Sequence, residues 1–255
     1  MSLTGEVAIV TGGSDGIGGA TARRLAEEGA AVLIVDVDAE GAAANAEAIT
    51  KAGGRASSMP GDVSKGADIK AMIDQCISTY GKLTVLVNNA YGSRPGLSLS
   101  GSAVELAEEG WDHAFDIGIK SHYLAAKHAI PHMENAGGGS IVNISSVHSL
   151  ACLPGAGPYD AAKWGVVGLG KSIAVELAAS GVRVNALSPG LCNTMMWQVR
   201  AAMLQSTHTH KCALHPAFRV VQTKQWRCDR DSWRPRGRRR PPRARTTVRA
   251  RPGLG

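Results

Sequence analysis

The feature that most constrains this chain is a regular alternation of short apolar runs and longer amphipathic stretches over residues 1–190. The apolar runs are nearly continuous, which is typical of strands that are buried on both faces of a parallel sheet. The stretches between them have the spacing of amphipathic helices. The predicted strands are Val7–Val10, Ala31–Val35, Leu83–Val87, Ile141–Ile144 and Val182–Leu187, with a weaker one at Ala56–Met59.

Five helices are predicted between these strands, and glycines at 29, 53 and 81 follow three of them, where helix C-termini commonly use glycine. A strand–helix repeat of this period predicts an α/β fold with a doubly wound parallel sheet of the Rossmann type. The length of 255 residues suits one such domain, which we expect over residues 1–196. The predicted helices are Gly16–Glu28, Ala39–Ala52, Lys65–Tyr80, Trp111–Ile130 and Tyr159–Ser180.

The pattern ends near residue 197, and the charge changes with it. Residues 1–210 carry 14 Lys and Arg against 19 Asp and Glu, a net charge of −5. Residues 211–255 carry 14 against 2, a net charge of +12. Because the Arg- and Pro-rich stretch 234–245 has few apolar side chains to bury, residues 197–255 are predicted to form a divergent, largely disordered tail. Such an ending is typical of translation in a shifted frame.

Several classes of protein are excluded by the same inspection. No apolar stretch approaches the roughly 20 residues of a membrane span, and residues 1–6 lack a targeting signal. The five cysteines are scattered and odd in number, which favours the reducing cytoplasm. The basic tail lacks the aromatic residues of a nucleic-acid module, so nucleic acid is not an expected partner. His208, His210, Cys212 and His215 fit no standard zinc spacing, so no metal site is predicted.

A glycine-rich turn, Thr11–Gly18, lies where the first strand should pass into the first helix. Glycines there let the backbone approach a pyrophosphate, and the helix N-terminus offers free N–H groups to it. Asp36 ends the second predicted strand, 18 residues after Gly18, where a carboxylate can accept hydrogen bonds from ribose hydroxyls. Asp36 and Asp38 would both repel a 2′-phosphate, so the sequence favours NAD over NADP.

A second group of residues points to proton transfer. Tyr159 and Lys163 are four residues apart at a helix start and so lie on one face. Tyrosine has an ordinary pKa of about 10, and a fixed cation nearby stabilises the phenolate and lowers that pKa. The strand Ile141–Ile144 runs into Ser145 and Ser146, which places a hydroxyl at the sheet edge where substrates bind in open α/β folds.

The chain therefore resembles the short-chain dehydrogenases/reductases, over about residues 4–196. The motifs occur in the family's order, and Tyr159 follows Ser146 by 13 positions, as the family pattern asks. The matching elements are Thr11–Gly18, Asp62 and Val63, the segment 88–90, Ser146, Tyr159 with Lys163, and the segment 188–190 with Thr194.

The resemblance implies a role for each matching residue. Ser146, preferred to Ser145 by its spacing, would bind the substrate oxygen, Tyr159 would be the acid/base, and Lys163 would hold the nicotinamide ribose and tune Tyr159. Asp62 and Val63 would contact the adenine, and Pro189, Gly190 and Thr194 the nicotinamide carboxamide side. The implied cofactor-binding residues are Gly12, Ser14, Asp15, Gly16, Ile17, Gly18, Asp36, Asp62, Val63, Asn89, Ala90, Tyr159, Lys163, Pro189, Gly190 and Thr194.

These residues predict an NAD-dependent oxidoreductase that moves a hydride between the cofactor and a secondary alcohol or ketone, of which 3-oxoacyl and sugar-type compounds are candidates. The resemblance also implies a homo-oligomer, a dimer or a tetramer. One alternative is a cofactor-binding remnant whose tail has impaired catalysis. Another is an interaction protein that uses the basic tail.

Three departures from the family pattern bear on activity. Gly118 stands where the family usually has asparagine, at a helix distortion whose main-chain carbonyl helps to hold a proton-relay water, so we expect reduced turnover. Tyr91 replaces the glycine that usually follows Asn-Asn-Ala, and its side chain either narrows the groove beside the nicotinamide or points outward. After Thr194 the sequence lacks the family's substrate-covering segment, and so does not identify the substrate.

Overall fold

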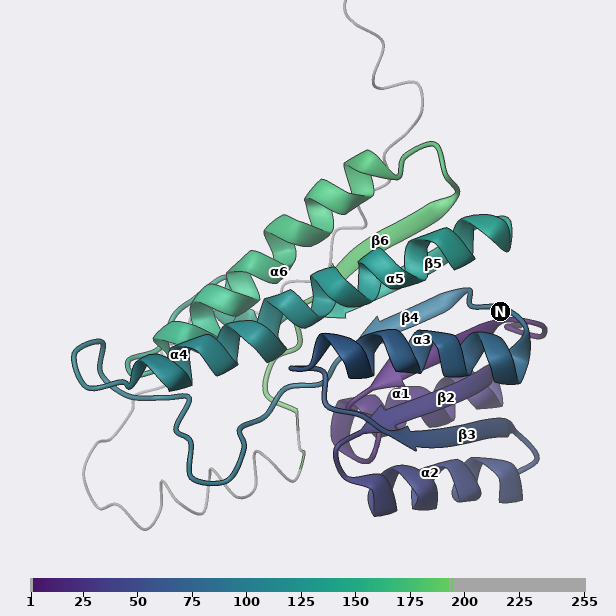
Figure 1. The fold of residues 1–255 in the computed structure, drawn as a ribbon, viewed down its shortest axis with the longest axis horizontal. Coiled ribbons are helices and arrows are strands. Elements are labelled where there is room, and N and C mark those ends of the chain that lie inside the picture. The colour runs from purple at the N-terminus through teal and green to yellow at the C-terminus, as the bar shows by residue number, and fades with distance from the viewer. Residues whose placement is uncertain (1, 193, 195–255) are drawn as a thin grey trace, which may run out of the picture.

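The computed structural model describes residues 2–192 and residue 194, and the expectations for the tail after 196 lie outside them. Six strands form one parallel sheet in the order β3-β2-β1-β4-β5-β6, which confirms the doubly wound sheet (Figure 1). The strands are β1 (Val7–Thr11), β2 (Ala31–Asp36), β3 (Arg55–Pro60), β4 (Val85–Asn88), β5 (Gly139–Ile144) and β6 (Val182–Leu187).

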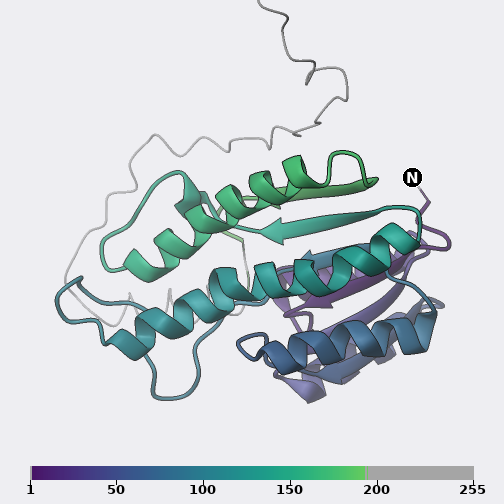
Figure 2. The same ribbon diagram turned by 45° about the horizontal axis from the view of Figure 1, so that its top comes forward.

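Helices cover both faces of this sheet (Figure 2). In β1, Val7 and Ile9 pack into one hydrophobic cluster with side chains of α3, α5 and α6, while Ala8 and Val10 pack into another with α1 and α2. Successive side chains of a strand point to opposite faces, so a strand buried on both faces must be apolar throughout. The helices are α1 (Gly16–Glu27), α2 (Ala39–Lys51), α3 (Gly66–Tyr80), α4 (Glu108–Phe115), α5 (Ser121–Asn135) and α6 (Gly157–Glu176).

The helix predicted over Trp111–Ile130 is present with a distortion at Gly118, as expected, but its bounds were wrong because it begins at Glu108 and ends at Asn135. It is divided into α4, a π-helical turn η1 (Asp116–Lys120) and α5, which continues past the predicted end to Asn135. The buried Gly118 lies in η1, where a residue without a side chain tolerates the distorted turn. The N-terminal part of α6 packs against α4 and η1.

The carboxyl ends of β1, β4 and β5 meet at one edge of the sheet. The strand order reverses between β1 and β4, which is where open α/β folds form their ligand crevice. Among the described residues no helix is both long enough and apolar enough to cross a membrane.

Candidate active site

The turn Thr11–Gly18 is packed too tightly to admit side chains at its glycines. A Cβ on Gly12 would lie 2.8 Å from Ala90 Cα, and the φ of 65° at Gly12 is in the left-handed region. Asp15, the N-cap residue of α1, makes no side-chain hydrogen bond to the helix, and the first turn holds no acidic residue. The helix N-terminus therefore keeps the character of an anion-binding site.

Residues at the end of β4 hold this turn in place. The Asn89 side-chain amide donates to the carbonyls of Thr11 and Gly12, each at 3.0 Å. The Thr11 hydroxyl in turn accepts the backbone N–H groups of Asn89 at 3.0 Å and Ala90 at 3.2 Å. The two loops across the strand-order reversal are thus joined by four hydrogen bonds.

Asn45 supports the turn from α2, and sequence reasoning missed it. Its buried side-chain amide donates to the Gly13 carbonyl at 2.7 Å, and its oxygen accepts from Arg23 Nη1 at 2.8 Å. The residue lies on the apolar face of an amphipathic helix, where a buried amide needs partners. A polar residue among the apolar positions of that helix was the available signal.

Asp36 lies at the carboxyl end of β2, beside the glycine turn, as predicted. One carboxylate oxygen accepts the Ser14 N–H at 2.9 Å and the other accepts the Asp38 N–H at 3.0 Å. A carboxylate offers about four lone-pair sites, so both oxygens can still accept hydroxyl donors. Ile17 lies in the first turn of α1, and its carbonyl accepts the Thr21 hydroxyl at 2.7 Å.

Asp62 and Val63 lie after β3 at the same edge of the sheet. Asp62 accepts the Ser64 N–H at 2.9 Å and the Ser64 hydroxyl at 2.7 Å. Burial acts to raise the pKa of the Asp62 carboxyl, but the bonds from Ser64 and the charge of Lys65 outweigh it and hold that pKa below 3.8. Val63 packs against the core.

The two serines after β5 are placed differently. The Ser145 hydroxyl is buried and donates to the Lys163 carbonyl at 2.8 Å. Ser146 caps the 3₁₀ turn η2 (Val147–Ser149), and its oxygen accepts the His148 N–H at 3.2 Å. Only Ser145 uses its proton in a hydrogen bond to the fold, whereas Ser146 accepts one.

Lys163 is buried in the second turn of α6. Its ammonium donates to the Ile144 carbonyl at 2.8 Å and lies 5.7 Å from the centroid of the Tyr159 ring. Burial lowers the pKa of Lys163 to about 8. The His122 side chain is also buried, close enough to Lys163 to feel its charge. Its Nε2 has no hydrogen-bond partner within the described part of the chain. Burial first, and then the charge of Lys163, lower the pKa of His122 to about 3.

The segment after β6 approaches both halves of the site. The Pro189 carbonyl accepts the Val147 N–H at 2.9 Å, beside the serine loop. Thr194 lies against the glycine turn, because a Cβ on Gly16 would be 3.4 Å from Thr194 Cγ2. Gly190 lies near Val147. All the residues assigned from the resemblance are therefore at the carboxyl edge of the sheet.

Tyr91 points inward, which decides between the two alternatives left open by the sequence. Its ring lies edge-to-face with the Tyr159 ring, with centroids 4.8 Å apart and an interplanar angle of 75°. The His148 ring also contacts the Tyr159 ring edge-to-face, with centroids 5.1 Å apart and an interplanar angle of 76°. His148 Nδ1 makes a hydrogen bond to the buried Asp160 carboxylate. Sequence reasoning missed this pairing, because His148 and Asp160 lie 12 residues apart on different elements.

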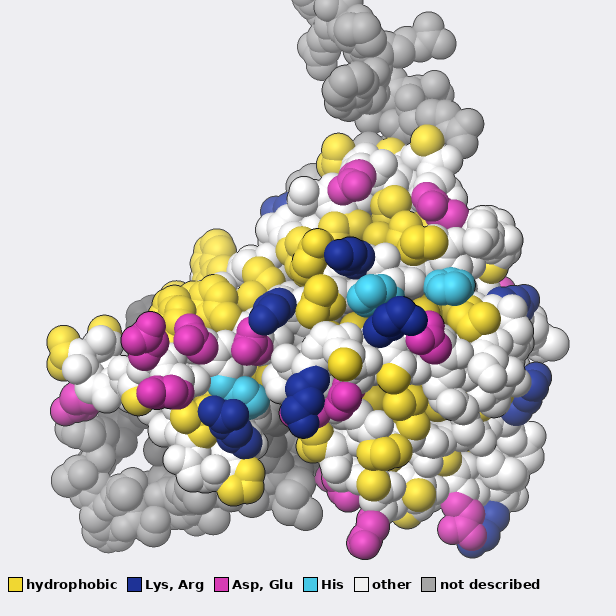
Figure 3. Space-filling model, in the orientation of Figure 1, with side chains coloured by type: hydrophobic (Ala, Val, Ile, Leu, Met, Phe, Trp, Pro, Cys, Tyr) yellow, Lys and Arg dark blue, Asp and Glu magenta, His cyan; other side chains and the backbone are white. Residues whose placement is uncertain are grey.

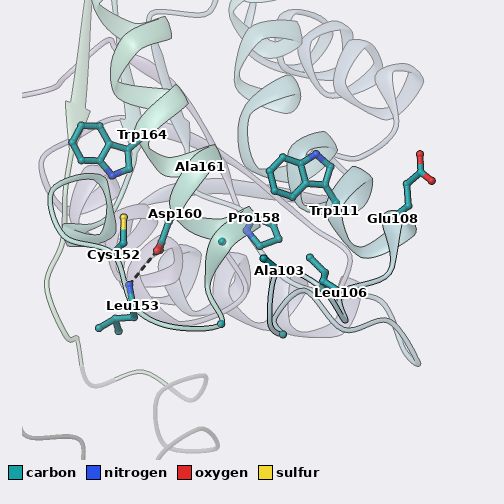
Figure 4. Close-up of a pocket in the computed structure, with 13 residues that line it drawn as sticks. Ala103, Leu106, Glu108, Trp111, Cys152, Leu153, Pro158, Asp160, Ala161 and Trp164 are labelled. Atoms are coloured by element: carbon teal, nitrogen blue, oxygen red, sulfur yellow. Dashed lines mark hydrogen bonds between the residues drawn. The ribbon is translucent and has the colours of Figure 1, made fainter.

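A cavity of about 660 Å³ lies next to the site (Figure 4). Trp111 of α4 and Trp164 of α6 flank it, and the loop carrying Cys152 and Leu153 borders it. Tyr159 is not among its lining residues, so this hollow is not assigned to the substrate. Among the residues that the structure describes, no cluster of three or more His, Cys, Asp or Glu side chains could hold a metal ion.

Comparisons with known proteins agree with this geometry. A family model for short chain dehydrogenases matches residues 6–205. The chain is 45% identical over 189 residues to cis-4-hydroxycyclohexanecarboxylate dehydrogenase of Sinomonas cyclohexanicum. The aligned residues cover 74% of each chain. It is 41% identical over 199 residues to 4-formylbenzenesulfonate dehydrogenase of Comamonas testosteroni, covering 77% of this chain and 76% of that one.

The solved structures give the same result. The crystal structure of levodione reductase matches with a TM-score of 0.74 and 31% sequence identity, over 80% of this chain and 78% of that chain. The residues matched by the family model include all six strands and the site residues from Gly12 to Thr194. The chain belongs to the short-chain dehydrogenase family of oxidoreductases.

Proposed function

We propose that this protein is an NAD-dependent oxidoreductase that interconverts a small secondary alcohol and its ketone, with Tyr159 as the acid/base. The observation that carries the proposal is the buried Lys163 ammonium beside the Tyr159 ring, one helical turn away and at the same sheet edge as the glycine turn. A buried cation next to a phenol favours the phenolate form, which a proton acceptor needs.

The residues present fit a dinucleotide. The glycine turn admits no side chain at Gly12 or Gly18, so its backbone can approach a pyrophosphate, and no side chain caps the start of α1, which leaves its N–H groups for the same anion. Bound NAD(H) supplies the hydride donor or acceptor. The proposed holding residues are those of the glycine turn (Gly12, Ser14, Asp15, Gly16, Ile17 and Gly18) with Asp36, Asp62, Val63, Asn89, Ala90, Tyr159, Lys163, Pro189, Gly190 and Thr194.

Each catalytic side chain would then have a defined part in the reaction. Tyr159 Oη takes the proton of the alcohol in oxidation and returns it to the substrate oxygen in reduction. Ser146 Oγ donates a hydrogen bond to that same oxygen and stabilises the charge that develops on it. Lys163 stabilises the phenolate by its charge and holds the nicotinamide ribose.

The preference for NAD rests on Asp36. Its carboxylate is fixed by two backbone N–H groups at the edge of the glycine turn, and Asp38 adds a second negative charge. Both charges would repel the 2′-phosphate of NADP. A cytoplasmic location of the protein is supported by its free thiols, because a reducing compartment keeps cysteines unpaired. Among the described residues these are Cys76, Cys152 and Cys192.

A homo-oligomer is supported by an apolar surface. Hydrophobic side chains gather along α6 in Figure 3. Trp164 and Val175 of α6 are 51% and 64% exposed, and Tyr123 of α5 is 48% exposed. Large apolar side chains on one face are typical of a surface that a second copy covers. Light scattering of the purified chain measures the mass, and a concentration-independent monomer contradicts the oligomer.

Enzyme assays test the proposed activity. NADH binding is measured by fluorescence, and NAD⁺ reduction is followed with a panel that includes cis-4-hydroxycyclohexanecarboxylate, simple secondary alcohols and 3-hydroxyacyl compounds, with levodione as a substrate for the reverse direction. We expect NADH binding and turnover of at least one compound, and Tyr159→Phe should lose turnover while keeping NADH binding. Cofactor binding without turnover of any compound would favour the impaired remnant instead.

A further inference from the structure

Tyr91 touches both members of the proposed reactive pair. Its ring meets the edge of the Tyr159 ring at a centroid distance of 4.8 Å, and the Lys163 Nζ lies 5.1 Å from the centroid of the Tyr91 ring. Perpendicular aromatic pairs and cation–ring contacts are both attractive, and both depend on orientation. One side chain from the loop after β4 thus contacts two side chains of α6.

The Tyr159 ring contacts a second ring as well. The His148 ring lies 5.1 Å from it at 76°, and the hydrogen bond from His148 Nδ1 to Asp160 fixes the imidazole. The phenol ring therefore makes edge-to-face contacts with two rings, and removing the Tyr91 ring would remove one of them.

Gly118 makes the space that the Tyr91 ring occupies. A Cβ at position 118 would lie 3.2 Å from Tyr91 Cε2 and 2.8 Å from the Ala162 Cβ in α6. These distances are shorter than ordinary carbon contacts, so a side chain at 118 would displace the ring or α6. The packing of the Tyr91 ring therefore depends on the glycine at position 118. An asparagine at 118 alone would not fit it.

The ring, rather than the hydroxyl, makes the contacts. Tyr91 Oη is buried and has no hydrogen-bond partner among the described residues. An unpartnered buried hydroxyl contributes nothing to holding the ring and costs free energy. Phenylalanine at this position should therefore preserve the packing.

We infer that Tyr91 is a positioning residue, whose ring holds the Tyr159 phenol and the Lys163 ammonium in their reactive orientation, and that Gly118 provides the room for that ring. The inference rests on the proposed function, since it assigns Tyr91 a part in the chemistry of Tyr159. It adds a residue to which no catalytic or binding role had been assigned.

Steady-state kinetics of Tyr91→Leu and Tyr91→Phe test the inference. Tyr91→Leu should lose at least about tenfold in kcat, because small misplacements of a reacting group are costly, while the Kd for NADH stays within about threefold. Tyr91→Phe should retain a kcat within about threefold of the parent, since it keeps the ring. Tyr80→Leu, which removes a half-buried tyrosine at the end of α3 that contacts Ser57 and the Val32 carbonyl, is the control for the loss of a packed tyrosine away from the site. A Tyr91→Phe loss as large as that of Tyr91→Leu would overturn the role of the ring.

A double-mutant cycle tests the link to Gly118. Gly118→Ala should lower kcat in the parent and lower it less in the Tyr91→Leu background, because the crowded ring is then absent. Equal losses in the two backgrounds would overturn the coupling.

A titration without turnover separates this inference from the proposed function. The tyrosinate difference spectrum between the parent and Tyr159→Phe reports the titration of Tyr159. The titratable groups that surround this phenol include Tyr91, His148, Asp160 and Lys163. The midpoint should move to higher pH in Tyr91→Leu, since water in the vacated space screens the ammonium, and stay in place in Tyr91→Phe. An unmoved midpoint in Tyr91→Leu refutes the positioning role, whereas an inactive parent with the expected shift refutes only the proposed reaction.

Discussion

Replacing Gly18 by alanine tests how the glycine turn is built. A Cβ at position 18 would lie under 3.0 Å from both the Gly12 carbonyl oxygen and Asn89 Nδ2. Neither atom can yield easily, because Asn89 Nδ2 donates to the carbonyls of Thr11 and Gly12 at 3.0 Å each. To admit the methyl group, the Asn89 amide must withdraw or the turn must open.

The expected cost follows from those contacts. Two lost hydrogen bonds are worth about 1 kcal/mol each, and overpacking adds about 1–3 kcal/mol. Alanine recovers about 0.5–1 kcal/mol over glycine within a helix, so the net loss of unfolding free energy is about 2–4 kcal/mol. For a domain of this size that lowers Tm by roughly 4–16 °C. The displaced turn should also weaken NADH binding by at least about tenfold, since the pyrophosphate approaches the backbone there.

Thermal melts by circular dichroism and NADH fluorescence titrations measure both effects. Gly168→Ala is the matched control, because it makes the same change in α6 at a position where a Cβ meets nothing within 4 Å. Its Tm should equal or slightly exceed that of the parent. If Gly18→Ala melts with the parent and binds NADH as tightly, the turn yields freely and the packing argument is wrong.

Three further predictions concern charge. Asp36→Ala should lower the NAD⁺ over NADP⁺ ratio of kcat/KM by at least about tenfold, since a unit charge near a phosphate is worth about 4 kcal/mol at 4 Å near a surface; an unchanged ratio contradicts the role of Asp36. Lys163 has a pKa of about 8 against 10.5 ordinarily, so between those values the unfolded chain binds a proton that the folded one does not. As the pH rises through this range, the parent should gain up to about 1.4 kcal/mol of unfolding free energy per pH unit, and Lys163→Met should not. Urea melts of both proteins at about pH 8 and 9 measure the gain. An equal change of unfolding free energy with pH in the two proteins would refute the lowered pKa of Lys163. His122 has a pKa of about 3 against 6.5, so stability should fall as pH drops below 6.5, because only the unfolded chain binds that proton. Urea melts of His122→Gln should show a smaller fall, and an identical fall would mean that His122 is not buried as described.

The sequence by itself determined the parts of this protein that depend on local spacing. Largely apolar runs located five strands, since a strand with both faces covered has few polar positions, and a weaker signal at Ala56–Met59 located β3, an edge strand of the sheet. The four-residue spacing of Tyr159 and Lys163 fixed them on one helix face, whatever the helix packs against. Asp36 and the glycine turn were located by their places at the ends of strands.

Only the tertiary structure decided where side chains from different elements meet. Ser145 and Ser146 are adjacent hydroxyls in the sequence, and the Lys163 carbonyl of α6 distinguishes them by accepting only the first. Tyr91 and Gly118 read as two separate departures until the packing of the loop after β4 against η1 joined them. Periodicity sets the direction of a side chain within its own helix or strand, whereas contacts between elements depend on how those elements pack, which no local pattern specifies.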